Sequence, residues 1–468
     1  TRELPGLAEA LSADAMAPRL QRMLADDWEL LACSPGKTFV EPGQGATLRY
    51  RLELRRRGDA DTVEHLVAGR LFLTAEAAEK WLSRVEVLAR QADGRDDLRA
   101  FPRPALLVRD LRLVLHVFPL DPALPGLVPA TDPAELLELL GPRLTSAVPG
   151  LLLQGCRIEP VRYGRDSAVL RYELAWRIQS NLRGLKQVMY GKVYADQRGR
   201  LVGPAVTALR QDRPNGSGPS LPFQVPRFQA YLPDVGLALL EAAVGSPLLP
   251  DLIRARWGVA AGPTNGTPTV EEAVAACARI AAALHRSSIP VGAPRTLAGE
   301  TDDVRTAVDA LATMAPALAA SLHRNLATVG GSALDAPGPV GVAHGDFHPS
   351  QVLFDGPTTR LVDFDTVCLA EPALDLGQFT AHLAVAVRTA QDAAGGTPDG
   401  AEDLGSAFLR EYLRHSPGSD PDVLLPRVAA YRTVALARLA VRSWCQLKPW
   451  RLRPTLALLD EPQRIHVS

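Results

Sequence analysis

The hydrophobic period of the chain changes near residue 270, and this change constrains the fold more than any other feature. Before it, residues 38–118 and 157–242 are expected to be largely strands, as in "QVMYGKVYAD", an alternating run with β-branched and aromatic residues. After it, apolar residues recur at three- and four-residue spacing, as in "VEEAVAACARIAAALHR", which predicts amphipathic helices. A strand-rich part followed by a helical part indicates an α+β protein with two unlike lobes.

Length and composition narrow the class of protein. A chain of 468 residues exceeds a single hydrophobic core, so two or three domains are expected. A net charge of −1 offers no basic surface for nucleic acid or anionic lipid, and no apolar run is long enough to span a membrane. The five scattered cysteines and the lack of a signal-peptide pattern predict a reduced, cytoplasmic protein.

Three segments of the first strand-rich region return in order in the second. The matched pairs are 45–54 with 167–176, 65–74 with 187–196, and 111–127 with 235–252. The first two pairs share an offset of 122 residues, since position 45 matches 167 and position 65 matches 187. These matches predict a duplicated β-rich lobe of about 120 residues, with Arg70 in the first copy where the second has Lys192. The alternative is a chance likeness between two meanders in a chain rich in Arg and Leu.

Lysine is scarce, with five among 51 basic residues, so a retained lysine can mark a chemical requirement. Lys192 lies in "QVMYGKVYAD", an alternating run that predicts a strand. A compact ammonium group on a strand suits a clamp for nucleotide phosphates. Because the first copy has Arg at this position, only the second copy is expected to bind phosphate. On the local pattern alone, a solvent-facing strand lysine is the alternative.

A dense polar segment, "VAHGDFHPSQVLFD", lies between apolar flanks at 342–355. We expect a loop there, in which His344 and His348 bond to the backbone and Gly345 allows an unusual backbone angle. Such a loop would project Asp346 into a cleft, where its carboxylate can accept the proton of an incoming hydroxyl.

Two oxygen-bearing side chains follow this acid. Gln351 offers an amide oxygen, a hard neutral ligand suited to Mg²⁺. Asp363, at the end of the predicted strand "TRLVDF", supplies a carboxylate that can bridge the same ion. A base, an amide ligand, a short hairpin and a metal carboxylate, in this order, are the parts of a kinase-type phosphoryl-transfer loop.

The pattern H-G-D-x-H-x-x-Q, followed by D-F-D and "EPALDLGQF", resembles the aminoglycoside phosphotransferase, choline kinase and maltokinase superfamily. The resemblance implies an α+β, bilobal protein-kinase-like fold, with a β-rich N-lobe, a helical C-lobe, and ATP and Mg²⁺ as cofactors. It makes Asp346 the catalytic base and Gln351 and Asp363 the magnesium ligands. It gives Asp375 a structural role, bracing the catalytic loop.

The resemblance extends more weakly to the second strand-rich region. There it makes Lys192 the phosphate-binding lysine, and it places the phosphate loop at "RYGRDSA" (162–168), which contains Ser167. Glu241 and Ala243 lie in the exit segment "LLEAAVGSP", the expected hinge, and complete the predicted nucleotide contacts. The turn has only one glycine, and no clear helix follows Lys192, so the glutamate that usually pairs with this lysine has no candidate.

Other acids keep more than one interpretation. Asp365 is a second metal contact, a substrate contact, or a solvated acid at the loop mouth. Glu402, Asp403 and Glu411 either bind a cationic acceptor or form a solvated helix face.

The expected organisation has three domains. Residues 1–148 form an N-terminal cap, which is a degenerate N-lobe-like repeat, and 149–247 form the nucleotide-binding N-lobe. Residues 248–468 form the helical C-lobe, with the catalytic loop and the acceptor site.

The leading hypothesis is an ATP- and Mg²⁺-dependent kinase that phosphorylates a hydroxyl of a small polar metabolite, such as a sugar, an amino sugar or an aminoglycoside. One alternative is a kinase of Ser or Thr in a peptide during natural-product maturation, with a sheet edge of the cap holding the peptide. Another is an inactive nucleotide-binding scaffold. No nucleic-acid or membrane partner is expected. The residues do not distinguish ATP from GTP, one acceptor from another, or a monomer from an oligomer.

Overall fold

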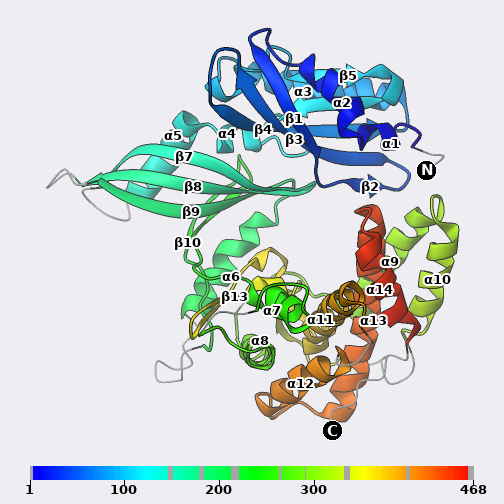
Figure 1. The fold of residues 1–468 in the computed structure, drawn as a ribbon. Coiled ribbons are helices and arrows are strands. Elements are labelled where there is room, and N and C mark those ends of the chain that lie inside the picture. The colour runs from blue at the N-terminus through cyan, green and yellow to red at the C-terminus, as the bar shows by residue number, and fades with distance from the viewer. Residues whose placement is uncertain are drawn as a thin grey trace. The chain divides into compact units, whose positions relative to one another are not determined.

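The computed structural model describes residues 4–145, 151–178, 184–211, 221–262, 266–289, 291–330, 338–396 and 401–461. The chain divides into two compact units, which are described separately (Figure 1). The first unit contains residues 1–199, 230–239 and 445–447, and the second contains residues 200–229, 240–444 and 448–468.

A six-stranded sheet forms the N-terminal part of the first unit. Its strands lie in the order β1-β3-β4-β6-β5, with β2 paired to β3. In chain order they are β1 (Trp28–Pro35), β2 (Phe39–Glu41), β3 (Gly45–Arg56), β4 (Thr62–Phe72), β5 (Ala105–Val108) and β6 (Leu113–Val117). Helices α1 (Leu7–Ala10) and α2 (Ala13–Gln21) precede the strands, and α3 (Ala75–Gln91) lies between β4 and β5.

Helix α3 covers this sheet because its apolar residues recur at helical spacing. Thr74 caps its start, where the side-chain oxygen accepts the Ala77 N–H at 3.2 Å. Val85 of the helix is fully buried and packs in one cluster with Phe72 and Val114 of the sheet.

A five-stranded sheet follows, in the order β10-β11-β9-β8-β7. Its strands are β7 (Leu151–Tyr163), β8 (Ser167–Ile178), β9 (Gly184–Tyr194), β10 (Phe228–Leu232) and β11 (Leu237–Glu241). Helices α4 (Leu127–Ala130) and α5 (Pro133–Thr145) precede β7, and α6 (Gly199–Gln211) lies between β9 and β10 in the chain.

The two sheets share one strand order. Apart from β2, each runs strand, strand, strand, helix, strand, strand, and the last strand lies between the third and the fourth. The register of the central hairpins also agrees: Thr47 lies opposite Arg70 in the β3–β4 pair, and Val169 lies opposite Lys192 in the β8–β9 pair. Each residue of the second pair therefore lies 122 positions after its counterpart in the first pair (47 to 169 and 70 to 192), which is the offset of the matched sequence segments.

The likeness extends to a segment that the sequence comparison missed. Leu-Pro-Gly-Leu occurs at 4–7 and again at 124–127, at the starts of α1 and α4. Tyr50 donates a hydrogen bond to the carbonyl oxygen that ends α1, at 2.7 Å, and Tyr172 donates one to the carbonyl oxygen that ends α4, at 2.9 Å. The same tyrosine therefore ties the same short helix to its sheet in both places.

The second unit is mainly helical. Its helices beyond α6 are α7 (Leu248–Arg256), α8 (Val270–His285), α9 (Leu297–Ala312), α10 (Pro316–Ala327), α11 (Pro372–Ala394), α12 (Ala401–Arg414), α13 (Pro421–Cys445) and α14 (Pro449–Asp460). Two two-stranded sheets pair β12 (Gly341–Ala343) with β15 (Cys368–Ala370) and β13 (Val352–Asp355) with β14 (Thr358–Leu361). Helix α8 begins at a reciprocal cap in which Thr269 and Glu272 each bond to the other's backbone.

The predicted change from strands to helices is confirmed, but helices α3 and α6 interrupt the ranges 38–118 and 157–242, which were expected to be largely strands. Helix α6 follows Lys192, where no helix was expected. Gly199, Gly203 and Pro204 in its sequence hid it, because these residues normally interrupt a helix. Its apolar residues Val202 and Val206 nevertheless recur at helical spacing and are buried.

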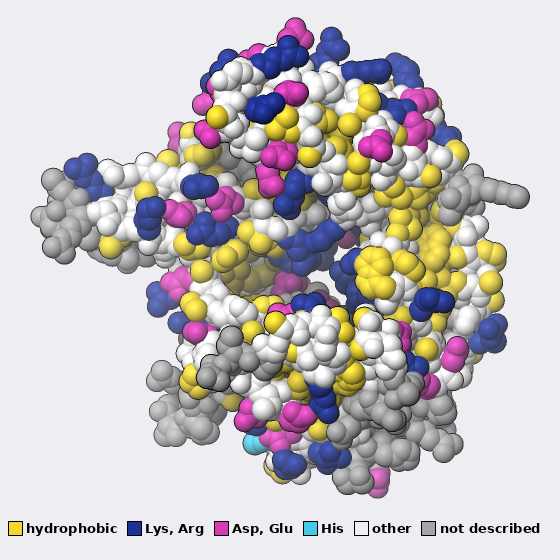
Figure 2. Space-filling model, viewed as in Figure 1, with side chains coloured by type: hydrophobic (Ala, Val, Ile, Leu, Met, Phe, Trp, Pro, Cys, Tyr) yellow, Lys and Arg dark blue, Asp and Glu magenta, His cyan; other side chains and the backbone are white. Residues whose placement is uncertain are grey.

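Charged side chains of both signs are interspersed over the surface of the first unit in the view of Figure 2, as a net charge of −1 suggests. Within the part of the chain that the structure describes, no helix is both long and apolar enough to cross a membrane.

Candidate active site

The polar segment predicted as a catalytic loop follows strand β12. Pairing of β12 with β15 ends at Ala343 opposite Cys368, and residues 344–351 then cross to β13. The β13–β14 hairpin returns the chain to Asp363, just after Leu361 pairs with Val352. Two short strand pairs thus position the loop and the second acidic cluster in the second unit.

Asp375 lies directly beneath this loop. Its carboxylate accepts the backbone N–H of His344 at 2.7 Å and that of Gly345 at 2.9 Å, and the side chain is fully buried. His285 Nε2 lies 3.1 Å from the same carboxylate. Burial raises the pKa of Asp375, but these hydrogen bonds and nearby charges outweigh it and hold the pKa below its usual value. This is the contact that the predicted bracing role requires.

Two side chains that sequence analysis missed hold the same loop. The Gln378 amide donates to Gly345 O at 3.1 Å and accepts the Phe347 N–H at 3.2 Å. Arg295 also donates to Gly345 O, at 2.9 Å, and is held by Glu300 at 2.7 Å. Gln378 stands inside "EPALDLGQF" and could have been found there, whereas Arg295 lies in no recognisable motif.

Gly345 takes a backbone angle that favours glycine, with φ of +78°. A Cβ atom at this position would collide with the carbonyl oxygen of Thr366. The sharp turn leaves Asp346 with a 44% exposed side chain, while His344 and Phe347 on either side are fully buried. The predicted base is therefore the carboxylate that the loop offers to solvent.

His344 and His348 both bond within the loop region, as expected. His344 Nε2 lies 2.9 Å from Val362 O, and Thr366 donates to His344 O at 3.0 Å. His348 Nδ1 accepts the Ser350 N–H at 3.2 Å, and Nε2 lies 3.8 Å from Asp346. Burial lowers the pKa of His348, and the Asp346 charge offsets this only in part.

The predicted metal ligands Gln351 and Asp363 meet across the loop. The Gln351 amide nitrogen lies 3.2 Å from Asp363 Oδ2 and 3.3 Å from His348 Nε2. Because His348 Nδ1 already accepts a hydrogen bond, its Nε2 carries the proton and faces another N–H group. Turning the amide would give His348 an acceptor and would set an oxygen beside Asp363, a pair that a divalent cation can hold together.

This donor set fits Mg²⁺. The ion is usually held by one or two protein oxygen ligands, with water and phosphate oxygens completing its coordination. Within the described ranges, no group of three His, Cys, Asp or Glu side chains forms a metal site, so a cage made wholly of such side chains is absent there.

Asp365 lies in the short helix η5 (Phe364–Thr366), directly after Asp363 and Phe364. It is only 8% exposed, so the interpretation as a solvated acid is wrong. Asp363 itself adopts a left-handed backbone, with φ of +70°, which Asp tolerates better than most residues. This turn brings the second acid under the protein surface.

Lys192 and Ser167 lie on one face of the β8–β9 hairpin, in the first unit. Lys192 is opposite Val169 and Ser167 is opposite Tyr194, and residues two apart on a strand share a face. The other face carries the buried core residues, among them Leu170. Lys192 is half-buried, with its ammonium 5.3 Å from the centre of the Tyr194 ring, so a fully solvent-facing lysine is excluded.

Helix α6 carries no acidic residue in its sequence, GRLVGPAVTALRQ. The glutamate that usually pairs with the lysine therefore has no counterpart on this helix, as the sequence suggested.

Glu241 and Ala243, the predicted hinge contacts, lie at the start of the segment 240–444 of the second unit. Glu241 accepts a hydrogen bond from the Gln229 amide at 2.9 Å. Just beyond Ala243, the Val244 carbonyl accepts a bond from Arg360 at 2.8 Å, and Ser246 N donates to Phe354 O at 3.0 Å. The hinge segment is thus bonded to the β13–β14 hairpin that leads to Asp363.

Glu411 is buried and already paired. It accepts hydrogen bonds from Arg279 at 2.9 Å and from Arg414, and His415 lies 3.2 Å away. The solvated-face interpretation is therefore wrong for Glu411, and its charge is matched within the protein. The side chains of Glu402 and Asp403 lie outside the described residues.

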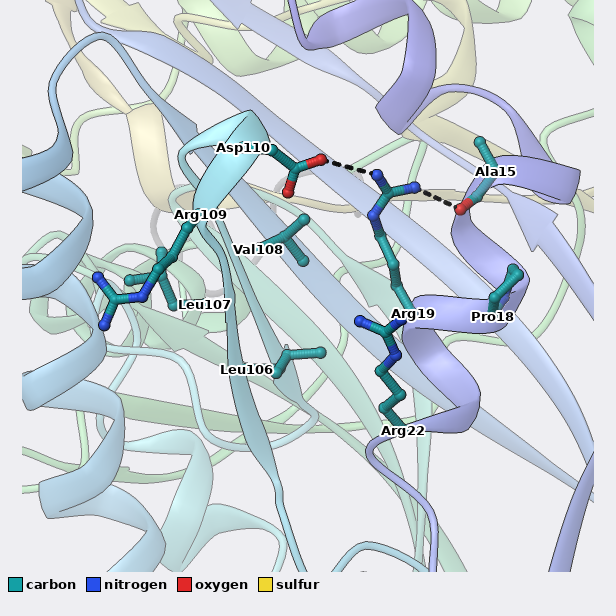
Figure 3. Close-up of a pocket in the computed structure, with 9 residues that line it drawn as sticks. All are labelled: Ala15, Pro18, Arg19, Arg22, Leu106, Leu107, Val108, Arg109 and Asp110. Atoms are coloured by element: carbon teal, nitrogen blue, oxygen red, sulfur yellow. Dashed lines mark hydrogen bonds and ion pairs between the residues drawn. The ribbon is translucent and has the colours of Figure 1, made fainter.

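A separate pocket of about 560 Å³ lies in the first unit, between α2 and β5. Figure 3 shows Arg19 bonded to Asp110 at 2.9 Å and to Ala15 O at 2.7 Å, with Arg22 below it and Arg109 to the left. None of the predicted site residues lines this pocket, so we do not assign it to the reaction.

The fold and this site define a phosphotransferase that acts on a hydroxyl group. Residues 72–416 match the phosphotransferase enzyme family (APH), and the chain belongs to that family. The match confirms the resemblance drawn from H-G-D-x-H-x-x-Q and the protein-kinase-like fold that it implied. No curated protein matches the chain.

Solved structures give distant likenesses. A macrolide 2′-phosphotransferase from Brachybacterium faecium is 18% identical, with 70% of this chain and 98% of that chain covered and a TM-score of 0.40. A choline kinase from Cryptosporidium parvum is 11% identical, with 69% and 92% covered and a TM-score of 0.44. A choline/ethanolamine kinase family protein from Mesorhizobium loti is 16% identical, with 70% and 96% covered and a TM-score of 0.39.

Proposed function

We propose that the protein transfers the γ-phosphoryl group of ATP, with Mg²⁺, to a hydroxyl of a small polar metabolite such as a sugar, an amino sugar or an aminoglycoside. The observation that carries the proposal is the loop that exposes Asp346 while Asp375 holds its backbone at 2.7 and 2.9 Å. A rigid loop with one exposed carboxylate can orient a hydroxyl and accept its proton.

Gln351 and Asp363 are the side chains that would hold Mg²⁺, and Asp365 is the adjoining acid. When bound, the ion would neutralise charge that develops on the transferring phosphoryl group. The Gln351 amide lies beside the Asp363 carboxylate, with its nitrogen 3.2 Å from Oδ2, and turning the amide would bring its oxygen to that place, which supports this assignment.

Lys192 would bind the nucleotide phosphates, with Ser167 at the phosphate loop and Glu241 and Ala243 at the hinge. The polar face shared by Lys192 and Ser167 on β8–β9 supports their joint role. In this proposal, residues 149–247 form the nucleotide-binding lobe and 248–468 the catalytic lobe.

Residues 1–148 would form the cap, a degenerate copy of the nucleotide-binding lobe. The shared strand order and hairpin register support a duplication. In the first copy, Arg70 binds both carboxylate oxygens of Glu41, each at 2.6 Å, and also contacts Thr47 at 2.7 Å. A carboxylate of the same domain thus takes the place that a phosphate would need, so this copy binds no nucleotide.

The test is a phosphoryl-transfer assay with ATP and with GTP against sugars, amino sugars, aminoglycosides and hydroxyl-bearing peptides, with Asp346→Asn as the inactive control. We expect a phosphorylated small molecule from the native protein and none from the variant. Phosphorylation of peptides alone would overturn the substrate class. Nucleotide binding without transfer to any acceptor would support the inactive scaffold instead.

A further inference from the structure

The β7–β8 turn, residues 163–167, occupies the phosphate-loop position of the second sheet, and it is bonded to the first sheet. All of the residues concerned belong to the first unit. A glycine-rich phosphate loop shapes itself around phosphates through its backbone, but this turn has only Gly164. Within the second sheet the turn is held by backbone bonds from Gly164 N to Ser167 O at 2.9 Å and from Ala195 N to Asp166 O at 3.0 Å, and further contacts come from the first sheet.

Arg49 of β3 makes the most direct contact. Its Nη2 donates to the carbonyl oxygen of Gly164 at 2.8 Å. Its guanidinium carbon lies 3.7 Å from the centre of the Tyr163 ring, in cation–π geometry. One arginine of the first sheet thus contacts two successive residues of the turn.

Asp121, just after β6, contacts both Tyr163 and Arg49. Its Oδ2 accepts the Tyr163 hydroxyl at 2.6 Å and lies 3.5 Å from Arg49 Nη2. Its other oxygen is fixed by the Ala123 N–H at 2.9 Å. Burial raises the pKa of Tyr163 well above its usual value, so the phenol keeps the proton that it donates.

Burial makes these contacts stronger than surface contacts of the same kind. The side chains of Arg49 and Asp121 are only 11% and 4% exposed. At the next position of the turn, the Arg165 guanidinium lies 4.7 Å from the centre of the Phe39 ring in β2. Three consecutive turn residues therefore each contact the first sheet.

The equivalent position in the second sheet does not act this way. Arg171 stands 122 residues after Arg49, at the matching register position, opposite Tyr190 as Arg49 is opposite Ala68. It bonds to Glu159 of its own sheet, at 3.3 Å. The reach of Arg49 to a turn outside its own sheet is thus a feature of this arginine and not of the repeated fold.

We propose that Arg49 and Asp121 are positioning residues for nucleotide binding: the first domain holds the β7–β8 turn in the shape that accepts the nucleotide phosphates. The degenerate copy then sets the nucleotide affinity of its functional counterpart, without touching the nucleotide. This inference rests on the proposed function, in which the lobe of β7–β11 binds ATP.

The experiment measures ATP affinity by calorimetry, together with KM for ATP and kcat, in Arg49→Ala, Tyr163→Phe and the double variant. Arg49→Ala should raise both the Kd and the KM for ATP about tenfold, with kcat changed less than about threefold. The reason is that an ordered turn can bind ATP directly, whereas a disordered turn must first be ordered, which costs free energy of binding. Tyr163→Phe, which removes only the bond to Asp121, should raise both about threefold. The double variant should bind ATP no more weakly than Arg49→Ala alone, because both substitutions act through the same turn.

The matched control is Arg109→Ala, which removes an exposed arginine of the same domain whose partner is Glu79 at 3.1 Å. It should leave the Kd for ATP unchanged. A role in stability alone would lower the melting temperature of Arg49→Ala without changing the ATP affinity of the folded protein, and that result overturns the inference.

Lys192→Ala separates this inference from the proposed function. If Lys192→Ala raises the Kd for ATP while Arg49→Ala and Tyr163→Phe leave it within twofold, only the inference is wrong. If neither Lys192→Ala nor Arg49→Ala changes it, the assignment of the nucleotide lobe fails, and the inference fails with it. Should Arg49→Ala not fold, Tyr163→Phe decides, since it keeps the ring and its packing.

Discussion

Asp346 stands out at the scale of single residues because its side chain is 44% exposed on a loop whose neighbouring side chains are buried. Asp346→Asn keeps the size of the side chain but removes the group that accepts the hydroxyl proton. We expect turnover to fall by at least about 100-fold, with ATP affinity and melting temperature unchanged. Steady-state kinetics and calorimetry check this. Turnover within about threefold of the native enzyme would remove Asp346 from the role of base.

Substitutions of Gln351 and Asp363 should change the Mg²⁺ requirement of the reaction, and not the removal of the hydroxyl proton. Gln351→Ala and Asp363→Ala should each raise the Mg²⁺ concentration needed for half-maximal activity, because each removes an oxygen ligand. Asp355→Asn, an exposed acid on the same hairpin paired with Arg360 at 3.1 Å, is the control and should change nothing. A Mg²⁺ titration that is the same in all three variants would contradict the metal assignment.

At the scale of elements, the start of helix α11 acts as the support of the catalytic loop. Asp375→Asn would place an NH₂ group against one of the two backbone N–H groups that the carboxylate oxygens now accept, those of His344 and Gly345. We expect a loss of at least about 2 kcal/mol in the free energy of unfolding at pH 7, measured with urea. Asp392→Asn, an exposed acid at the far end of the same helix, should cost much less.

The pH dependence of this loss has a defined sign. The pKa of Asp375 is lower in the folded protein, so its contribution is present above the unfolded pKa of about 4 and is lost as the pH falls through the folded value. The difference between native protein and Asp375→Asn should therefore shrink below about pH 4. A difference that stays constant down to pH 2 would contradict a charged Asp375.

The sequence predicted the elements that carry strong periodicity or a dense motif. Strands, helices and the loop around Asp346 follow from local pattern, and the contacts of His344 and Asp375 agree with the expected geometry. Helix α6 was missed because Gly203 and Pro204 mask its apolar spacing. The apolar spacing that marks this helix was therefore present in the sequence, although it was not recognised as helical.

Other contacts had no local signal at all. Arg295 reaches Gly345 across 50 positions of sequence, and Arg49 reaches Gly164 across 115. Neither pair belongs to a motif, and each depends on how the strands are laid beside one another. A single sequence gives no means to choose such partners among 51 basic residues.

At the scale of the whole molecule, the two sheets should differ in function despite their common strand order. Arg70→Ala should leave the Kd for ATP unchanged, while Lys192→Ala should raise it by about tenfold or more. Arg70→Ala should also lower the melting temperature, because it leaves Glu41, which is 7% exposed, without its ion pair. Nucleotide binding that weakens in Arg70→Ala alone would reverse the assignment of the two lobes.

The first sheet should also make the molecule sensitive to mild acid. Burial lowers the pKa of His116 to about 4, from an ordinary value near 6.5. The unfolded chain therefore binds a proton that the folded chain excludes, and stability falls from about pH 6.5 down to about pH 4, by roughly 3 kcal/mol in total. Trp81, whose ring centre lies 6.4 Å from that of His116, offers a fluorescence probe. In His116→Gln the stability should be flatter over this range, and an unaltered slope would contradict the prediction.

The shared hairpin register has a consequence for how the chain reaches its native state. A fully unfolded chain offers hairpin β3–β4 two sheets of the same strand order to join, its own and that of β8–β9, and the same holds in reverse. During synthesis the first sheet can close before the second emerges, so the ambiguity never arises. Recovery of ATP binding after refolding from urea should therefore fall below that of newly made protein, and swapped dimers should account for the difference. Whether the chain folds during synthesis or refolds from the fully unfolded state then decides what fraction of the molecules pairs each hairpin with its own sheet.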